Sequence, residues 1–560
     1  MGKPWLVSAD QQDIVKQIAQ RYRMSDLVAR CVVNRELHLN GELDDFLELD
    51  DYQPPDPFLM PDMDVAVERI ARALAKRERI CIYGDYDADG VSSIAILSQA
   101  LRALGGDVFY YIPDRFFEGV GLNCQRLRLL QQEEGVALVI TVDTGSRAFE
   151  EMDYARQLGL DIIVTDHHTP DQRRPNALAV INPKLSCSVY PGPSLSGAGV
   201  AYKLAEGLSQ RFPGKIDLGA LIKIAAIGTV ADMVLLHGEN RWIVYRGLRE
   251  IDAEERGPLR TLLRRVGVRG RVHSLDISFR VAPRINAPGR LGDPDISIQF
   301  FEDRAPRDIQ RNIDVMDGMN QVRQAIEKDM TDRLENQIRS ILAKELPAFV
   351  LLAGRNWHRG ILGIMACKML RRLSRPVCIL SYGEEEAHGS IRALSGMDVM
   401  TPLGEVASLL RSFGGHAEAA GVCLPITNIP LFKDRMNELL QPQVEDLLPQ
   451  MRQFVDAEVE WRDVNRRFFE GIYKLAPFGT GNPIPVFLCR NLILESNLQR
   501  RGPWYHFEVS DGMISRRCSF YQPLEMDETL ERFDSVDLLF SVTPFKDDFQ
   551  IQVVELRPSQ

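Results

Sequence analysis

The stretch Tyr83–Ile96, YGDYDADGVSSIAI, places three aspartates at alternate positions directly ahead of a glycine. The apolar run RICIYG that leads into it predicts a buried strand. The residues after it repeat apolar side chains on one helical face, at Ile94, Leu97, Leu101 and Leu104. A strand, a turn that carries carboxylates and a helix are typical of an open α/β sheet, in which ligands bind beyond the carboxyl ends of the strands.

The same triplet matches the first half of a calcium-binding EF-hand loop, because Asp85, Asp87, Asp89 and Gly90 follow the pattern D-x-[DN]-x-[DN]-G. The second half does not match. Ile96 stands where the loop needs a bidentate Glu, and a strand leads into the loop where an EF-hand has a helix. A calcium loop is therefore the least favoured interpretation.

The composition indicates a globular protein of several domains. A chain of 560 residues with 45% hydrophobic residues can bury several cores, which predicts about three or four domains. No apolar run reaches the roughly 18 residues of a membrane span. The N-terminal residues MGKPWLVSADQQD also lack the basic and apolar regions of a signal peptide. We therefore expect a cytoplasmic protein without membrane association.

The cysteines and the net charge bear on whether the protein is disulfide-rich, zinc-binding or nucleic-acid-binding. The nine cysteines are scattered without a C-x-x-C pair, which predicts reduced thiols that are neither zinc ligands nor a disulfide framework. The net charge of −11 argues mildly against nucleic-acid binding by the chain as a whole. A basic groove can nevertheless exist on an acidic chain.

Strands and helices alternate from about residue 60 to 250, where the apolar runs DVFYYIP, VALVITVD and LDIIVTD predict a largely parallel sheet. The domain that contains this sheet is predicted for residues 51–306. A short N-terminal segment, residues 1–50, precedes this domain. Residues 307–346 contain no proline, and an apolar side chain recurs there at every fourth position from Ile326 to Leu342. This spacing predicts one long connector helix, which would span roughly 50 Å.

A second α/β domain is predicted for residues 347–445, with strands in AFVLLAG and PVCILSY and a helix in ILGIMACKMLRRL. From residue 446 to 560 the pattern changes to short alternating runs such as YHFEVSD and FQIQVVEL, separated by turn residues. Short strands at regular spacing predict a small β-barrel.

Acidic and imidazole side chains follow the ends of several apolar runs. The residues concerned are Asp85, Asp87, Asp89, Asp143, Asp166, His167, His168 and Asp232. Neighbouring parallel strands would bring them within several ångströms of one another. Taken singly, Asp143 is better explained as a helix N-cap and His167 as a satisfied buried histidine. The combination on one sheet favours a shared site.

Carboxylates that converge in this way repel one another, and each costs several kcal/mol to keep ionised without compensation. Asp and His ligands without Cys favour hard or borderline cations such as Mn²⁺ or Mg²⁺, and there are enough ligands for two ions. Two such ions about 3.5–4 Å apart clamp the attacking and leaving oxygens of a phosphoester. The predicted chemistry is therefore phosphodiester or phosphoanhydride hydrolysis.

Four segments resemble, in order and spacing, the motifs of the DHH phosphoesterase superfamily. They are GDYDADG (84–90), VDTG (142–145), TDHH (165–168) and GTVAD (228–232). GSIR (389–392) and FGGHAEAAG (413–421) resemble the motifs of its companion DHHA1 domain. Further segments are similar to the bacterial single-strand-specific exonuclease family of this superfamily, namely EGVGL (118–122), RINAPGRLG (284–292), NWHRGILGI (356–364) and APFGTGNPIPVF (476–487).

The resemblance implies an α/β fold in which a DHH parallel-sheet domain is joined by a long helix to a DHHA1 α/β domain, followed by a C-terminal OB-fold β-barrel. It also implies a metal-dependent 5′-to-3′ exonuclease that releases mononucleotides from single-stranded DNA in recombination and repair. The implied cofactors are two divalent cations, Mn²⁺ or Mg²⁺. The implied partners are single-stranded DNA, a single-strand-binding protein and a helicase, and the protein is expected to be a monomer.

Carried over position by position, the resemblance implies that Asp87, Asp89, Asp143, His167 and Asp232 are metal ligands. Asp143 would bridge the two ions, and His168 would lie beside the metals and the scissile phosphate. Asp85 is left outside this predicted ligand set. Many relatives outside the exonucleases carry a histidine four residues before the first aspartate of the D-x-D pair, where this chain has Tyr83.

The predicted substrate-binding residues have the chemistry of an anion site. They are Arg115, Arg290, Ser390, Arg392, Gly414, Gly415 and His416. Glycines let backbone N–H groups approach an anion closely, and a guanidinium fork meets phosphate oxygens in pairs. By resemblance these residues bind the 5′ end and the nearby backbone. His358 is predicted to line the groove and not to ligate a metal.

Three alternatives to the exonuclease remain open at this point. One is a DHH enzyme that hydrolyses short oligonucleotides, polyphosphate or pyrophosphate, and one is a catalytically silent DNA-binding scaffold. The calcium-binding protein is the third. The C-terminal aromatics Trp504, Tyr505 and Phe507 also allow two interpretations, because they can stack on bases or fill the barrel core.

Overall fold

The computed structural model describes residues 4–8, 11–39, 41–114, 117–119, 121–303, 305–343, 346–496, 498–502, 504–521, 535–545 and 548–559. The chain divides into two compact units, which are described separately. The larger unit comprises Trp5–Val315 with Phe454–Gln560, and the smaller unit comprises Met316–Gln453 with Met1–Pro4.

The larger unit contains a five-stranded sheet in the order β3-β2-β4-β5-β6, and every neighbouring pair is parallel. Its strands are β2 (Arg79–Gly84), β3 (Asp107–Tyr111), β4 (Val136–Val142), β5 (Asp161–Thr165) and β6 (Ala179–Ile181). The chain first adds β3 on one side of β2 and then adds β4, β5 and β6 on the other side. The order therefore reverses between β2 and β4, which is where doubly wound sheets bind their ligands.

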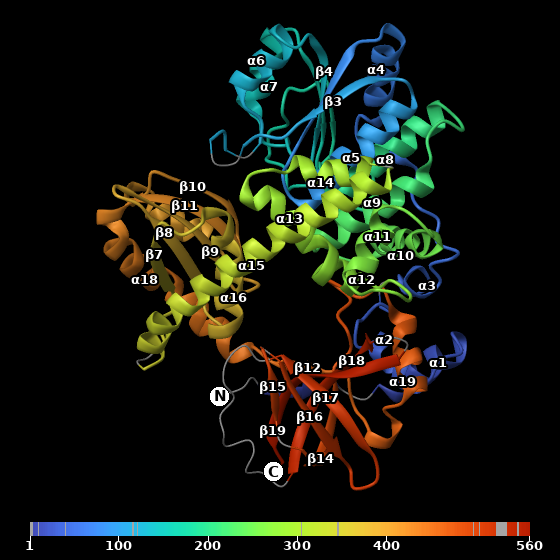
Figure 1. Cartoon of the computed structure of the whole chain (residues 1–560), viewed down its shortest axis with the longest axis vertical. Helices are drawn as coiled ribbons and strands as arrows, with labels where there is room; N and C mark the ends of the chain where they lie inside the picture. The colour runs from blue at the N-terminus through green and yellow to red at the C-terminus, as the bar shows by residue number, and fades with distance from the viewer. Residues whose placement is uncertain are drawn as a thin grey trace. The chain divides into compact units, whose positions relative to one another are not determined.

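Helices connect the strands of this sheet (Figure 1). They are α5 (Ala88–Ala103), α6 (Cys124–Gln132) and α7 (Phe149–Gln157), and α4 (Met63–Lys76) precedes β2. Helix α5 begins where the Asp87 carboxylate accepts hydrogen bonds from the N–H groups of Asp89 and Gly90. Almost all of its side chains are buried, because α5 packs against the sheet and against α8 and α9. The glycine that follows the triplet is required by packing, since a Cβ on Gly90 would lie 2.5 Å from the carbonyl oxygen of Asp85.

A helical layer follows the sheet along the chain. Its members are α8 (Gly197–Arg211), α9 (Leu218–Ala231), α10 (Gly238–Ala253), α11 (Pro258–Arg265), α12 (Ser274–Asp276), α13 (Ala282–Leu291) and α14 (Asp295–Glu302). Helices α8, α9 and α10 pack on one another and present the N-terminus of α8 and the C-terminus of α9 to the switch point of the sheet.

The C-terminal part of the larger unit is a β-barrel. Its strands are β13 (Ala457–Glu458), β14 (Phe487–Leu494), β15 (Gln499–Arg501), β16 (Trp504–Ser510), β17 (Ser515–Tyr521), β18 (Ser535–Phe545) and β19 (Asp548–Pro558). Pairing of β14 with both β18 and β16 closes the ring β14-β16-β17-β19-β18, in which β17 and β19 are parallel. Closure of five strands in this order is the arrangement expected of an OB-fold.

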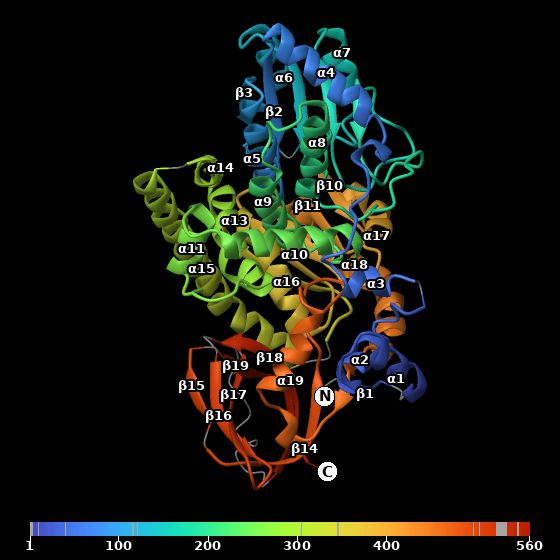
Figure 2. The ribbon, with the colours of Figure 1, turned by 90° about the vertical axis from the view of Figure 1, so that its right-hand side faces the viewer.

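The N-terminal segment packs on this barrel, although the two are separated by most of the sequence. The segment contains β1 (Trp5–Val7), which pairs with β12 (Gln453–Val455), and α1 (Gln12–Arg21), α2 (Asp26–Val33) and α3 (Leu43–Leu47). Val28, Val32 and Phe46 share one buried core with Trp461 and Phe540. Figures 1 and 2 show α1 and α2 beside the barrel and α19 (Arg466–Ile472).

A fully buried arginine ties the barrel segment to the helical layer. Arg241 on α10 donates hydrogen bonds of 2.9–3.0 Å to the carbonyl oxygens of Phe46, Leu475, Ala476 and Pro477. The segment APFGTGNPIPVF therefore serves as a structural junction, because its backbone carbonyls satisfy a buried cation.

The smaller unit contains most of α15 (Pro306–Leu342) and a five-stranded sheet in the order β10-β11-β9-β8-β7. The strands are β7 (Val350–Arg355), β8 (Val377–Tyr382), β9 (Glu386–Arg392), β10 (Ser412–His416) and β11 (Ala419–Pro425), and the helices are α16 (Leu362–Leu373), α17 (Met400–Glu405) and α18 (Ile429–Leu447). Strands β7 and β8 are parallel, and the other neighbours are antiparallel. Met330, Leu334 and Ile338 of α15 are buried in the core of this unit, so the second half of the predicted connector helix is also a packed element.

The predicted fold class is confirmed: a parallel-sheet domain, a long helix, a second α/β domain and a C-terminal barrel follow in that order. All nine cysteines lie in described residues, and all are free thiols. Among the helices that the structure describes, none is long and apolar enough to cross a membrane.

Candidate metal centre and anion site

The side chains that follow the strands of the larger unit's sheet meet at the switch point between β2 and β4. Asp89 is buried in the first turn of α5, and its two carboxylate oxygens accept hydrogen bonds of 2.7 and 2.9 Å from the N–H groups of Gly197 and Ala198. These N–H groups open helix α8, whose positive N-terminal end stabilises an anion. Asp89 is thereby fixed by a helix that begins more than a hundred residues later in the chain.

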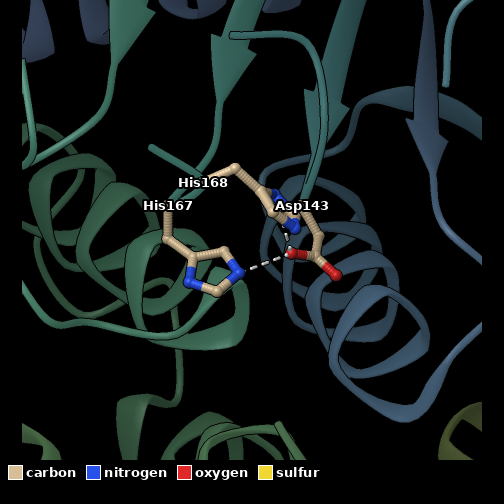
Figure 3. A group of neighbouring side chains, drawn as sticks. All are labelled: Asp143, His167 and His168. Atoms are coloured by element: carbon tan, nitrogen blue, oxygen red, sulfur yellow. Dashed lines mark ion pairs between the residues drawn. The ribbon is translucent and has the colours of Figure 1, made fainter. Parts of the chain in front are cut away.

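Asp143 follows β4 and lies at the centre of the group. Its backbone adopts a left-handed conformation with φ 59°, and its N–H donates to the carbonyl oxygen of Thr165 at 3.0 Å. The Asp143 Oδ1 atom lies 3.0 Å from His167 Nε2 and 3.9 Å from His168 Nδ1, as the dashed lines in Figure 3 show. The left-handed residue turns the carboxylate toward both imidazoles at the end of β5.

His167 connects Asp143 with two further carboxylates. Its Nε2 atom lies 3.8 Å from Asp89 Oδ2 and 3.6 Å from Asp232 Oδ2. Asp232 is the residue at the C-terminus of α9, and 27% of its side chain is exposed. One imidazole nitrogen therefore faces carboxylates from three separate elements.

His168 is oriented by a different carboxylate. Asp166 Oδ1 lies 2.8 Å from His168 Nδ1, and the carboxylate also accepts from the N–H groups of Ser146, His167 and His168. The hydrogen bond directs the other ring nitrogen, Nε2, away from Asp166. Asn182 adds support by donating to the His168 carbonyl oxygen at 2.9 Å.

The pKa values of the buried carboxylates and histidines are shifted, because several acidic groups lie close together away from water. Burial raises the pKa of Asp89 and of Asp143 well above the ordinary range, and the neighbouring carboxylates raise both further. Burial and the charge of Asp87 raise the pKa of Asp232 to about 7. Burial lowers the pKa of His167 to about 3, so its imidazole is neutral and able to ligate a cation. Burial alone would lower the pKa of His168, but the hydrogen bond and charge of Asp166 raise it to about 9.

Divalent cations fit this donor set. Three overlapping groups offer ligand atoms that lie within 4.8 Å of one another: Asp85, Asp87 and Asp143; Asp89, His167 and Asp232; and Asp143, His167 and His168. Asp143 Oδ1 is buried and accepts no hydrogen bond among the residues that the structure describes. A buried carboxylate oxygen without a donor is costly unless a cation neutralises it. Carboxylate oxygens and imidazole without sulfur suit Mg²⁺ or Mn²⁺.

The first two groups divide the five predicted ligands between two positions. Asp87 and Asp143 belong to one, and Asp89, His167 and Asp232 belong to the other. Asp143 is near the second position as well, because its Oδ1 atom lies 3.0 Å from His167 Nε2. Asp85 joins the first position, although it was left outside the predicted set. Tyr83 does not join it, because its buried hydroxyl donates to the carbonyl oxygen of Gly121 at 3.2 Å.

Two glycines make room for the carboxylates. A Cβ on Gly197 would lie 2.7 Å from Asp143 Oδ1, and a Cβ on Gly228 would lie 2.6 Å from Asp89 Oδ1. Sequence reasoning missed Gly197, and it included Gly228 only as part of the GTVAD motif. The sequence gives only a weak indication that a glycine lies against a metal ligand, because the atoms that a side chain would meet at that position are known only from the folded chain.

The RINAPGRLG segment forms much of α13 and packs on the D-x-D-x-D turn. Asn286 Oδ1 accepts from the Ala88 N–H at 2.8 Å, and a Cβ on Gly289 would lie 2.3 Å from the carbonyl oxygen of Tyr86. Arg290, predicted to bind substrate, is the next residue of this helix and is half-buried. Arg115, the other predicted arginine of the larger unit, lies outside the described residues.

In the smaller unit, the remaining predicted substrate residues lie on β9 and β10, the two strands that flank β11. Ser390 on β9 stands opposite Gly421 on β11, which stands opposite Gly414 on β10. Arg392, Ala419 and His416 form the next row. Paired residues share one face of a sheet, so Ser390, Arg392 and His416 surround a patch where β11 offers only small side chains. We call Ser390, Arg392, Gly414, Gly415 and His416 the hairpin site.

The hairpin site has the features of an anion site. Arg392 Nη1 donates to Ser390 Oγ at 3.0 Å and to the Ile391 carbonyl oxygen at 2.8 Å, which orients the guanidinium along the strand. Gly414, Gly415 and His416 are exposed. A Cβ on Gly415, whose φ is 149°, would lie 2.2 Å from the Ala419 carbonyl oxygen, so the hairpin requires glycine there.

Other predicted residues have local roles. His358 Nδ1 accepts from the Gly360 N–H at 3.2 Å and so caps a short 3-10 turn. In the barrel, Phe507 belongs to the core and Tyr505 is buried, whereas Trp504 makes an edge contact with the half-exposed Tyr521 at a centroid distance of 5.1 Å.

Comparisons with known proteins support the same three-part organisation. Family models match residues 79–229 (DHH family, N-terminal domain), 341–441 (DHHA1 domain) and 455–552 (RecJ OB domain).

The chain is similar over most of its length to several proteins named single-stranded-DNA-specific exonuclease RecJ. The Bacillus subtilis protein is 36% identical over 88% of this chain, and the Salmonella typhimurium protein is 31% identical over 78% of it. The chain spans 62% of the length of the Bacillus relative and 79% of the length of the Salmonella relative.

Solved structures give the same result. The structure matches RecJ in complex with Mn²⁺ from Thermus thermophilus with a TM-score of 0.82 and 27% identity, over 100% of this chain and 80% of that one. RecJ with Mg²⁺ from the same organism matches with a TM-score of 0.76 and 25% identity, over 100% and 79% of the two chains. The chain therefore belongs to the RecJ family of single-stranded-DNA-specific exonucleases.

Proposed function

We propose that the chain is a metal-dependent exonuclease that degrades single-stranded DNA from the 5′ end and releases mononucleotides in recombination and repair. The observation that carries this proposal is the convergence of Asp87, Asp89, Asp143, His167 and Asp232 at one buried point of the sheet, with Asp143 near both groups of ligands. Two divalent cations bound there would activate water and neutralise the phosphate during hydrolysis.

The chain's own residues hold these ligands in place. Asp87 is fixed as the N-cap of α5, and Asp89 is fixed by the N–H groups that open α8. His167, neutral because it is buried, offers Nε2 as a ligand atom. Since none of these groups has to move, the geometry is set before substrate binds, which lowers the cost of reaching the transition state.

His168 is proposed to act on the scissile phosphate. Asp166 holds Nδ1, which keeps the ring oriented and favours the imidazolium form. The Nε2–H group is then a charged donor, which can bind a phosphoryl oxygen as negative charge develops on it. We therefore propose His168 and Asp143 as catalytic residues, and Asp166 as the residue that positions His168.

The hairpin site is proposed to bind the 5′-terminal phosphate. Arg392 supplies the planar fork, Ser390 and His416 supply further donors, and Gly414 and Gly415 expose backbone N–H groups. Arg290, beside the D-x-D-x-D turn, and Arg115 are proposed as further contacts to the DNA backbone. The barrel is proposed to track the strand, with Trp504 and Tyr521 as the aromatics available for stacking.

The test compares three labelled substrates with the full chain: 5′-phosphorylated single-stranded DNA, the same sequence as duplex, and a short oligonucleotide. Each is incubated with Mn²⁺, with Mg²⁺ and with chelator. Progressive release of mononucleotides from the long single strand alone, abolished by chelator, is the expected result. Preference for the short oligonucleotide would favour the other hydrolase activity of the superfamily, and release of nothing with either metal would leave a DNA-binding scaffold.

Partners and cellular context are part of the same proposal. Single-strand-binding protein and a helicase would supply the substrate, because the enzyme needs exposed single strands. The protein would act in the cytoplasm as a monomer. Sedimentation of the full chain with and without a single strand tests the monomer, and co-sedimentation with single-strand-binding protein tests that partner.

A further inference from the structure

Three side chains on one face of the smaller unit's sheet lie outside the proposed exonuclease machinery. Glu386 and His388 alternate along β9, and Cys423 on β11 stands directly opposite His388. Alternate residues of a strand and directly paired residues share a face, so the carboxylate, imidazole and thiol point to the same side. We call these three residues the Glu–His–Cys group.

The ligand atoms of this group are close enough to hold one ion. Cys423 Sγ lies 3.7 Å from Glu386 Oε2 and 4.0 Å from His388 Nε2, and all three atoms lie within 4.8 Å of one another. In tetrahedral zinc sites the metal–sulfur and metal–nitrogen bonds place neighbouring ligand atoms about 3.5 Å apart. The two distances from Cys423 Sγ, 3.7 and 4.0 Å, are therefore close to this spacing, and the carboxylate and imidazole atoms lie within 4.8 Å of each other.

The surroundings also suit a cation. A hollow of about 450 Å³ opens beside the group, and its lining includes His388 and the consecutive glutamates Glu384, Glu385 and Glu386. Arg411 lies 3.6 Å from Glu386 Oε1, the oxygen that does not face the thiol. The arginine can therefore orient the carboxylate while Oε2 remains directed at Cys423.

The protonation states are compatible with ligation. Burial and the charge of Arg359 lower the pKa of His388, which leaves a neutral imidazole. Burial and the charge of Glu386 raise the pKa of the Cys423 thiol. A metal ion would have to displace that proton, as it does at thiolate sites generally.

The donor set of the Glu–His–Cys group selects a metal different from the one proposed for the larger unit. We call the proposed ligands there, Asp87, Asp89, Asp143, His167 and Asp232, the carboxylate–histidine cluster. Thiolate with imidazole and carboxylate suits borderline and soft ions, of which Zn²⁺ is the usual one, whereas oxygen-rich sites suit Mg²⁺ and Mn²⁺. The sequence predicts no zinc ligand among the cysteines, because they are scattered without a C-x-x-C pair. The β9–β11 pairing brings them together.

We propose that Glu386, His388 and Cys423 bind one Zn²⁺ ion, with the fourth coordination position open to the hollow. The site lies on the same strand as Ser390 and Arg392 but shares no residue with the hairpin site. Zn²⁺ binding by these three residues does not require the proposed exonuclease activity.

Co²⁺ and Cd²⁺ are the probes for this site, because a bond from either ion to thiolate gives an ultraviolet charge-transfer band that oxygen and nitrogen ligands do not give. Titration of the reduced full chain should produce this band with a stoichiometry of one, and Zn²⁺ should abolish it by displacement. Absence of the band would overturn the proposal.

Matched variants locate the ion. Cys423→Ser should abolish the band, and Cys367→Ser, which removes a half-buried thiol on α16, should retain it. His388→Ala keeps the thiol and should weaken Co²⁺ affinity by about 10-fold or more, as loss of a ligand does. Asp143→Asn alters the carboxylate–histidine cluster and should leave the band unchanged. A band that survives Cys423→Ser, or that disappears with Asp143→Asn, would contradict the assignment.

Discussion

The carboxylate–histidine cluster and the hairpin site are both predicted to meet phosphate, yet they are built in opposite ways. In the first, Asp89, Asp143 and His167 are buried and come from separate elements, and burial raises the pKa of both carboxyls and lowers the pKa of the imidazole. In the second, Arg392 and His416 lie on β9 and β10, the two strands that flank β11 in one small sheet, and His416 is exposed.

The difference in burial indicates different roles, with the buried cluster suited to metal-dependent hydrolysis and the hairpin site suited to binding the DNA. Buried carboxylates are unfavourable unless cations join them, so such a cluster is useful for holding metals. The half-buried guanidinium of Arg392 can bind an anion through charge-assisted hydrogen bonds beside the exposed Gly414 and Gly415, so the hairpin site is suited to docking. Substitutions in the cluster should therefore change kcat, and those in the hairpin site should change KM.

The largest effect is expected from Asp143→Asn. Asparagine tolerates the left-handed backbone of this position but removes the charge shared by both groups of ligands. Cleavage of 5′-labelled single-stranded DNA should fall by on the order of 10³-fold, while strand binding measured by fluorescence anisotropy stays within a few fold. The exposed Asp171→Asn is the control. Parallel loss of binding and cleavage would mean that this carboxylate serves docking or folding.

Gly197→Ala should have the next largest effect. The new methyl group would lie 2.7 Å from Asp143 Oδ1, so the carboxylate has to shift. We expect about 100-fold lower kcat and weaker Mn²⁺ binding by calorimetry, with little change in KM. Gly270→Ala is the matched control, because nothing lies within 4 Å of its Cβ position. Equal effects of the two substitutions would show that the close contact with Asp143 does not matter.

Asp166→Asn should act through His168. The substitution keeps the shape but removes the charge that raises the His168 pKa and orients its ring. A decrease in kcat of about 10- to 100-fold is expected, with Mn²⁺ affinity nearly unchanged, because Asp166 belongs to none of the three ligand groups. Loss of Mn²⁺ binding in calorimetry would instead make Asp166 part of the metal centre.

Arg392→Ala should have the smallest effect on catalysis and should change affinity. Removal of one charge-assisted contact raises KM for 5′-phosphorylated DNA by about tenfold, with kcat nearly preserved. The preference for a 5′-phosphate over a 5′-hydroxyl should disappear as well. The exposed Arg371→Ala on α16 should change neither parameter. A fall in kcat at unchanged KM would remove the distinction between the two sites.

Much of the fold was predictable, because each element carries a local signal. The alternation of apolar strands with helix-period segments predicted the parallel sheet, and the regular repeat from Ile326 to Leu342 predicted α15. The packing partners of these elements had no such signal. The N-terminal helices join the core of the C-terminal barrel, and Met330 and Leu334 join the core of the smaller unit, through contacts far apart in sequence. The residue boundaries assigned to the domains remain proposals.

The site was predictable in part. Acidic and imidazole residues at strand ends identified the side chains that the structure brings together, since parallel strands align their carboxyl ends. The supporting groups were missed. Gly197 and Ala198 contribute backbone N–H groups, and Gly197 also leaves space for the Asp143 carboxylate. Asn286 contributes an amide oxygen. No sequence pattern marks residues with such roles.

The sequence by itself determined the opening turn. Asp85, Asp87 and Asp89 follow a buried strand and begin a helix, and Ile96 excludes a calcium loop, because these features depend on residues close together in the chain. Only the tertiary structure decided which carboxylates lie close enough together to share an ion: it groups Asp85 with Asp87 and Asp143, and it groups Asp89 with His167 and Asp232. The physical reason is that ligand distances depend on how strands and helices pack, and packing joins residues that the chain separates.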